Sequence, residues 1–94
     1  SGYRINRQVA DFGEHVRGWR MVLGLTAQQV SERAGITRDT LRKIESGNPN
    51  VSFNSVTQVL RALGILDQLV DAADPLASDI GRLRAGRLTR KRAR

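Results

Sequence analysis

The chain has 94 residues, enough for one small domain with a thin hydrophobic core. It contains no cysteine, which excludes disulfides and cysteine-based zinc sites and fits a reducing cytoplasm; no apolar run approaches the roughly 20 residues of a membrane span. The net charge of +7 favours an acidic partner, with nucleic acid as the first choice.

The positive charge is confined to one end of the chain. Residues 1–81 hold nine basic and nine acidic residues, so this part is neutral as a whole. The entire excess comes from Arg82, Arg84, Arg87, Arg90, Lys91, Arg92 and Arg94. The protein is therefore expected to be a neutral domain with a basic tail, and its net charge alone does not indicate that the domain binds DNA.

The first helix is indicated by apolar residues at steps of three and four. Val9, Phe12, Val16, Trp19 and Leu23 share one helical face, on which Phe12 and Trp19 are expected to be core residues. A glycine at position 24 ends the pattern. Residues 1–7 are expected to form an N-terminal arm, and the opening Ser-Gly pair is typical of a cloning remnant.

Three shorter helices follow, each with a capping residue at its start and a glycine at its end. The expected caps are Thr26 (with Gln29 as its capping-box partner), Thr37 and Ser52, and the expected terminators are Gly35, Gly47 and Gly64. The residues expected to face inward are Ala27, Val30, Ala34, Leu41, Ile44, Val56, Val59, Leu60 and Leu63. No stretch alternates like a strand, so the fold is expected to be all-α.

A fifth helix is expected over residues 65–73, where the Asp74-Pro75 pair breaks it. Its apolar residues Leu66, Leu69 and Val70 either close the core of the monomer or form a dimer face. The helical domain is thus predicted to cover residues 8–73. The remainder, residues 74–94, is expected to be a basic tail that is disordered when alone.

The stretch LTAQQVSERAGITRDTLRKIESG, residues 25–47, has the features of a helix-turn-helix. Gly35 supplies the turn, and Ser31 is small enough for the point where the two helices cross. Leu41 and Ile44 anchor the second helix on the core. This leaves its outer face to Arg38, Asp39, Arg42 and Lys43.

This stretch resembles the helix-turn-helix of Cro and phage repressors, the xenobiotic-response-element-like regulators. The likeness covers about residues 14–70 and includes VSFNSVTQVLRALGI, which is similar to the family's fourth helix. The resemblance implies a five-helix domain whose second motif helix reads the major groove of DNA. It places Arg38 and Asp39 at base-reading positions, with Arg42 and Lys43 further along the helix.

The resemblance also implies contacts beyond the bases. Thr37 and Gln28 fall at or next to phosphate-contacting positions, although Ala27 replaces the glutamine that usually begins the first motif helix. Arg20 and Glu45 match a structural ion pair of the family. Chemically, an arginine in the first turn of a groove-lying helix can bind guanine with two hydrogen bonds. Asp39 is expected to accept a hydrogen bond from cytosine or to clamp Arg38.

The expected function is a sequence-specific transcriptional repressor, a homodimer on a palindromic double-stranded DNA operator. Within this class, the layout resembles antitoxins of the HipB type, which bind a HipA-like kinase toxin. The alternative is a protein-interaction adaptor whose tail docks on an acidic partner without specific DNA binding. The tail itself has three interpretations: a functionless end, an arm along phosphates, or a segment that orders against an acidic groove.

Enzymatic function is not expected. Ser31 and Thr37 have no histidine base within the motif, and there is no glycine-rich nucleotide loop after a strand. His15 is the only histidine and has no cysteine partner, so neither a metal nor another cofactor is expected.

Overall fold

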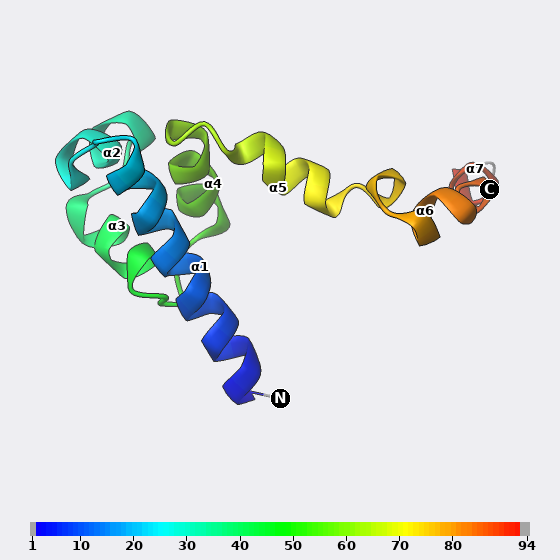
Figure 1. Ribbon diagram of the computed structural model, residues 1–94, viewed down its shortest axis with the longest axis horizontal. Helices are drawn as coiled ribbons and strands as arrows, with labels where there is room; N and C mark the ends of the chain where they lie inside the picture. The colour runs from blue at the N-terminus through cyan, green and yellow to red at the C-terminus, as the bar shows by residue number, and fades with distance from the viewer. Residues whose placement is uncertain (1, 93–94) are drawn as a thin grey trace.

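The computed structural model describes residues 2–92, and all regular structure within that range is helical. The expected all-α fold is thereby confirmed. The helices of the bundle are α1 (Gly2–Val22), α2 (Ala27–Ala34), α3 (Arg38–Glu45), α4 (Phe53–Ala62) and α5 (Leu66–Ala73), shown in Figure 1. The chain continues through a 3-10 turn, η1 (Pro75–Ala77), and two short helices, α6 (Asp79–Leu83) and α7 (Gly86–Arg92).

The backbone confirms the predicted capping residues and terminating glycines. The side chains of Thr26, Thr37 and Ser52 each accept a hydrogen bond from the third residue of the following helix. Thr26 and Gln29 form the complete capping box, with reciprocal bonds of 3.0 and 2.9 Å. The described residues with positive φ are Gly24, Gly35, Gly47 and Gly64, the four expected terminators. These short-range devices fix where each helix of the bundle starts and stops.

The hydrophobic core is small and lies between α1, α2, α3 and α4. Its members are Val16, Val30, Ala34, Leu41, Ile44, Val59, Leu60 and Leu63. All eight are at positions predicted to be apolar and inward-facing. The prediction for α1 is wrong in part, because Phe12 and Trp19 keep 37% and 43% of their surface exposed. The apolar stripe of α1 is therefore wider than the part of it that the bundle covers.

The first helix begins at Gly2, so residues 2–7 extend α1 and do not form a separate arm. Figure 1 shows this end of α1 projecting past the rest of the bundle. Tyr3 and Ile5 in this part of α1 are exposed. These residues contribute nothing to the core, so no apolar stripe in the sequence predicts a helix here. Helical hydrogen bonding simply continues into solvent, since no proline interrupts it.

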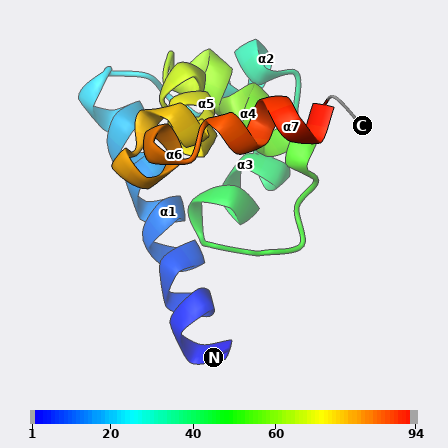
Figure 2. The same ribbon diagram turned by 90° about the vertical axis from the view of Figure 1, so that its right-hand side faces the viewer.

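The tail is helical through Arg92, in contrast to the disorder expected for it. Asp74 caps η1 by accepting a hydrogen bond from the Leu76 N–H (2.9 Å), and Ser78 caps α6 through the Gly81 N–H (3.1 Å). We call residues 75–92 the arm. Figure 1 shows it standing away from the bundle at the far end of α5, and Figure 2 views the molecule from the arm's end, with α7 lying across the view.

Within the bundle, α1 approaches the end of α3 so closely that backbone meets backbone. A Cβ atom on Gly13 would lie 2.5 Å from the Ile44 carbonyl oxygen and 2.7 Å from that of Glu45. On the other side of the contact, a Cβ on Gly47 would lie 2.6 Å from the Cα of Ala10. Only glycine leaves room for backbone to touch backbone here, so these two glycines set the distance between α1 and α3.

We expect Gly13→Ala to destabilise the fold by roughly 1–3 kcal/mol, because the added methyl group overlaps immobile backbone atoms and forces the helices apart. Gly18→Ala is the matched control in the same helix, since nothing lies within 4 Å of its added Cβ. That variant should gain up to about 1 kcal/mol from better helix propensity. Equal melting temperatures of the two variants in thermal denaturation would contradict this role for Gly13.

Candidate nucleic-acid interface

The third helix has one buried and one exposed side. Leu41 and Ile44 are buried, with 1% and 4% of their surface exposed, and they hold α3 against the core. The side chains at positions 38, 39, 42 and 43 are exposed, as expected. Because apolar residues three apart share one face of a helix, the polar residues between them must point outward.

The turn between α2 and α3 has the geometry of the predicted motif. Gly35 adopts a left-handed conformation with φ of 69°, and its N–H bonds back to the Glu32 carbonyl. The Ile36 N–H closes the turn on the Ser31 carbonyl at 3.0 Å. Ser31 is buried, and its hydroxyl donates to the Ala27 carbonyl (2.7 Å), so the polar atom in the crossing is satisfied.

Asp39 binds the two basic residues further along α3. Its carboxylate lies 2.7 Å from Arg42 Nη2 and 3.3 Å from Lys43 Nζ. The hydrogen bond from Arg42, followed by that from Lys43, lowers the pKa of Asp39 below its ordinary value. The expected clamp of Asp39 on Arg38 is wrong, because residues three and four apart are neighbours on a helix and adjacent residues are not.

Arg38 instead points back toward α2, where its Nη1 donates to the side-chain oxygen of Gln28 at 3.4 Å. Gln28 in turn donates to Glu32 at 2.9 Å. The structure thus brings the expected base-reading arginine next to an expected phosphate contact. The other expected phosphate contact, Thr37, uses its hydroxyl oxygen as the cap of α3, accepting from the Thr40 N–H at 3.1 Å.

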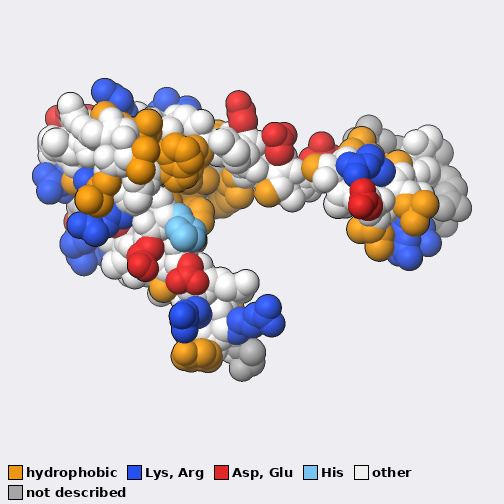
Figure 3. Space-filling view, in the orientation of Figure 1, with side chains coloured by type: hydrophobic (Ala, Val, Ile, Leu, Met, Phe, Trp, Pro, Cys, Tyr) orange, Lys and Arg blue, Asp and Glu red, His pale blue; other side chains and the backbone are white. Residues whose placement is uncertain are grey.

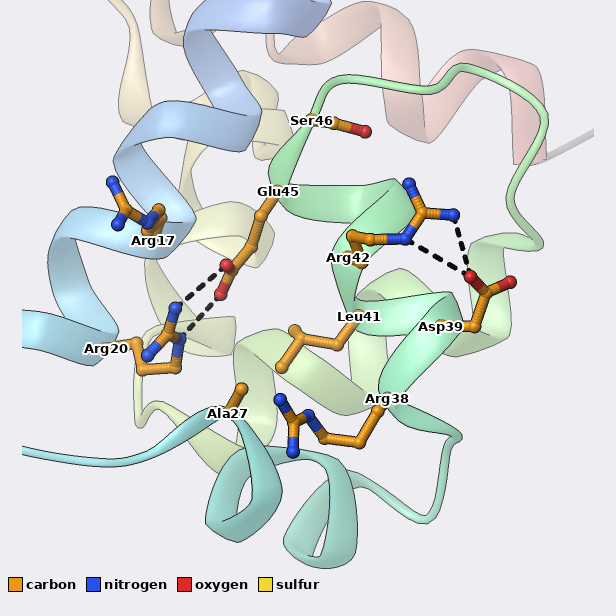
Figure 4. Close-up of a pocket in the computed structure, with 9 residues that line it drawn as sticks. All are labelled: Arg17, Arg20, Ala27, Arg38, Asp39, Leu41, Arg42, Glu45 and Ser46. Carbon is orange, nitrogen blue, oxygen red and sulfur yellow. Dashed lines mark hydrogen bonds and ion pairs between the residues drawn. The ribbon is translucent and has the colours of Figure 1, made fainter.

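A shallow cavity of about 580 Å³ lies between α1, the start of α2 and α3. Its lining residues, drawn in Figure 4, are Arg17, Arg20, Ala27, Arg38, Asp39, Leu41, Arg42, Glu45 and Ser46. Four guanidinium groups therefore border one hollow. Arg20 and Arg42 are paired with acids, whereas Arg17 and Arg38 have no ion pair with the acidic residues that the structure describes. Figure 3 shows the same basic edge along α2 and α3.

Arg17 is the residue of this cavity that sequence reasoning missed. It lies on α1, outside the helix-turn-helix motif, so the motif does not predict it as part of the interface. Its spacing of three residues from Arg20 is the signal that could have found it, because such residues share a face of the helix. The basic surface thus includes the first helix as well as α3.

The Arg20–Glu45 ion pair, expected from the family resemblance, is present. Arg20 Nε lies 2.7 Å from Oε2 of Glu45 and its Nη2 lies 3.0 Å from Oε1, so the contact is bidentate. Both side chains are largely buried, with 16% and 11% exposed. The hydrogen bond to Glu45 raises the pKa of Arg20. A further bond from Arg20 to the Leu25 carbonyl (3.4 Å) ties α1 to the link before α2.

The residues expected at a dimer face lie on α5. Leu66 is partly buried against the core, whereas Leu69 and Val70 are exposed. In the arm, Arg82 is engaged by Asp79 and by the Leu76 carbonyl (2.9 Å), while Arg84 and Arg87 are exposed. Arg94 lies outside the described residues, as do the side chains of Arg90, Lys91 and Arg92. No helix within residues 2–92 is long and apolar enough to cross a membrane.

The geometry described so far defines a helix-turn-helix protein, and comparison with known proteins agrees. A family model described as a helix-turn-helix domain matches residues 11–73. The chain belongs to this family. It is also 39% identical over 49 residues to an "uncharacterized HTH-type transcriptional regulator" of Methanothermobacter thermautotrophicus, a match that covers 52% of this chain and 71% of the relative. No solved structure matches the chain significantly.

We expect the Arg20–Glu45 pair to couple by more than about 1 kcal/mol, the upper end for exposed pairs, because it is bidentate and mostly shielded from water. Thermal or urea unfolding of Arg20→Met, Glu45→Gln and the double variant measures this coupling. Each single variant should lose more stability than the exposed pair variant Asp39→Asn. Strictly additive losses in the double variant would show that the two side chains do not stabilise one another.

Proposed function

We propose that the protein is a sequence-specific DNA-binding transcriptional regulator, acting as a repressor. The observation that carries the proposal is the two-sided α3, which is anchored by Leu41 and Ile44 and presents three basic side chains outward at the edge of a complete helix-turn-helix. Membership of the helix-turn-helix family supports the same conclusion.

In this proposal α3 lies in the major groove with its first turn toward the bases. Arg38 leaves Gln28, its weak partner at 3.4 Å, and forms two hydrogen bonds with a guanine. Asp39 holds Arg42 and Lys43 beside itself, which orients Arg42 and limits the repulsion between the carboxylate and the phosphates. Asp39 is also placed to accept a hydrogen bond from a cytosine.

The phosphates are bound around this base-reading turn. Gln28 and Thr37 flank the start of α3, and Arg17 borders from α1 the cavity that Arg38 also lines. An arginine without an acidic partner can exchange water for a phosphate oxygen at little electrostatic cost. We therefore add Arg17 to the phosphate contacts that the sequence had indicated.

We further propose that the protein binds a palindromic operator as a homodimer. Leu69 and Val70 are exposed on α5, which contributes no fully buried residue to the monomer. Apolar side chains on the exposed side of a helix suit an isologous interface, in which the same patch serves both subunits. Two copies of α3 would then read two half-sites.

A narrower proposal is that the protein is an antitoxin that represses its own operon and binds a HipA-like kinase toxin. It rests on the resemblance to HipB-type regulators. The arm, with exposed Leu83, Arg84 and Arg87, offers a segment for a protein partner. The same feature favours the alternative function, an adaptor that binds an acidic protein without reading DNA.

One experiment separates regulator from adaptor. The protein is titrated with DNA from upstream of its own gene at several salt concentrations, with and without competitor DNA. A regulator gives a defined footprint that survives competitor and a steep salt dependence. Weak binding that is equal on all sequences would favour the adaptor.

For the recognition helix, we expect Arg38→Ala to weaken operator binding by roughly 1–3 kcal/mol and to relax the preference at one base pair, because a bidentate guanine contact is lost. Affinities for the operator and for operators with single base changes measure both effects. The controls are Lys43→Ala and Arg17→Ala. Both should weaken binding more evenly across sequences, without relaxing the preference at one base pair. An Arg38→Ala protein with unchanged base preference would refute the assignment.

For the dimer face, we expect Val70→Asp to weaken dimerisation by roughly 2 kcal/mol or more, because it places a charge within an apolar interface. Gln68→Asp adds the same charge to an exposed position on the other side of α5 and serves as the control. Sedimentation equilibrium gives the dimer dissociation constants. Equal constants for the two variants would exclude this patch as the interface.

A further inference from the structure

Among the exposed apolar side chains, two groups lie on different parts of the molecule, one on the bundle and one on the arm. The first group lies in the angle between α1 and α5, where Figure 3 shows hydrophobic side chains gathered beside the single histidine. We call Phe12 and Trp19 of α1 with Leu69 and Val70 of α5 the α1–α5 face. All four are at least one-third exposed, including the only tryptophan of the chain.

The second group lies on the arm. Ile80 and Leu83 of α6 are 61% and 82% exposed, and Leu88 of α7 is 44% exposed. Arg84 and Arg87 join Ile80 and Leu88 around a hollow of about 290 Å³. The arm is therefore a short helical pair with both apolar and basic side chains outward, which a solvated end of the chain does not require.

The arm is held away from the α1–α5 face of its own chain. At the elbow between η1 and α6, a Cβ on Gly81 would overlap the Pro75 carbonyl oxygen, so these backbones are in direct contact. Arg82 spans the elbow by donating to the Leu76 carbonyl (2.9 Å) and pairing with Asp79. These contacts fix α6 in the outward direction seen in Figure 1, which leaves the face of the same chain out of reach.

The charges around the two groups are complementary. Asp11 and Glu14 lie on α1 next to the apolar stripe, and Asp67 and Asp71 lie on α5; all four are exposed. None of these acids takes part in an ion pair with another described residue. The described basic side chains of the arm that are likewise unpaired are Arg84 and Arg87.

We propose that the arm of one copy docks on the α1–α5 face of a second copy, and that the exchange is reciprocal. This inference rests on the proposed homodimer and specifies what covers its apolar surface. Leu83 and Leu88 meet Phe12 and Trp19 of the other copy, while Arg84 and Arg87 lie against its acidic residues. A two-fold axis repeats every contact, so two copies cover both faces and both arms at once.

A second copy is the occupant that the observations favour. Every copy carries one arm and one face of matching character, so no third component is needed to bury either. DNA would be repelled by the four acidic residues around the face. A different protein would have to supply both a basic apolar segment and an acidic apolar groove to cover the same surfaces.

Trp19 reports directly on the docking, because it is the only tryptophan and lies on the face. We expect its emission to be at short wavelength in the dimer and to shift to longer wavelength on dilution, as the arm leaves. Leu83→Gln should raise the dimer dissociation constant at least about tenfold and shift the emission at a fixed concentration. Thr89→Gln, an exposed arm position, is the control and should change neither.

A charge swap tests the register of the two surfaces. Arg87→Glu and Glu14→Arg should each weaken dimerisation, and the variant carrying both changes should recover at least half of the loss on a logarithmic scale, since the reversed charges meet across copies. Arg87→Glu with Asp39→Arg, a charge change outside the face, is the matched control and should show no recovery.

Several outcomes overturn the exchange. A dimer in which Trp19 emits at long wavelength, or one unaffected by Leu83→Gln, leaves the homodimer proposal intact and refutes the arm contact. Short-wavelength emission that persists in dilute monomer shows docking of the arm on its own chain. If the arm variants lose operator binding but still dimerise, the arm contacts DNA and not a second copy. A chain that is monomeric at all concentrations refutes the exchange together with the proposed homodimer.

Discussion

The contact between α1 and the end of α3 fixes the direction in which α3 presents its side chains. Gly13 allows the backbones to touch, and the Arg20–Glu45 ion pair closes the same junction a little further along α1. Removing one charge would leave the other largely buried without a partner, which is costly. The proposed base-reading turn, the arginine-lined cavity and the position of Arg17 all depend on this junction.

Local chemistry made most of the fold predictable from the sequence. A threonine cap with glutamine three residues on, or a glycine after an apolar run, acts within one turn of chain, and Thr26, Thr37, Gly35 and Gly64 behave as their sequence neighbours indicate. The core anchors Leu41 and Ile44 followed from helical period alone. The Arg20–Glu45 pair, in contrast, joins residues 25 positions apart, and only the family resemblance indicated it.

The sequence predictions that the structure contradicts have physical causes of their own. Periodicity predicts the apolar stripe of α1 but not how much of that stripe is covered. Trp19 therefore fits the pattern of a core residue although 43% of its surface is exposed. The charge of the tail indicated disorder, yet short-range contacts at Ser78, Gly81 and Arg82 stabilise helical turns there. Asp39 pairs with Arg42 and Lys43, three and four residues along the helix, and not with the adjacent Arg38 as expected. The importance of Gly13 depends on a backbone contact that no single-sequence pattern encodes.

The buried and outward sides of α3 have separate roles, which affects how the sequence of the protein can evolve. Its attachment to the bundle uses Leu41, Ile44 and Glu45, and its outward side uses a different set of residues. Substitutions on the outward side can therefore accumulate with little effect on folding, so the surface proposed to read DNA can evolve on a constant scaffold. Asp39 is the exception, because through Arg42 and Lys43 it links three outward positions that would have to change together.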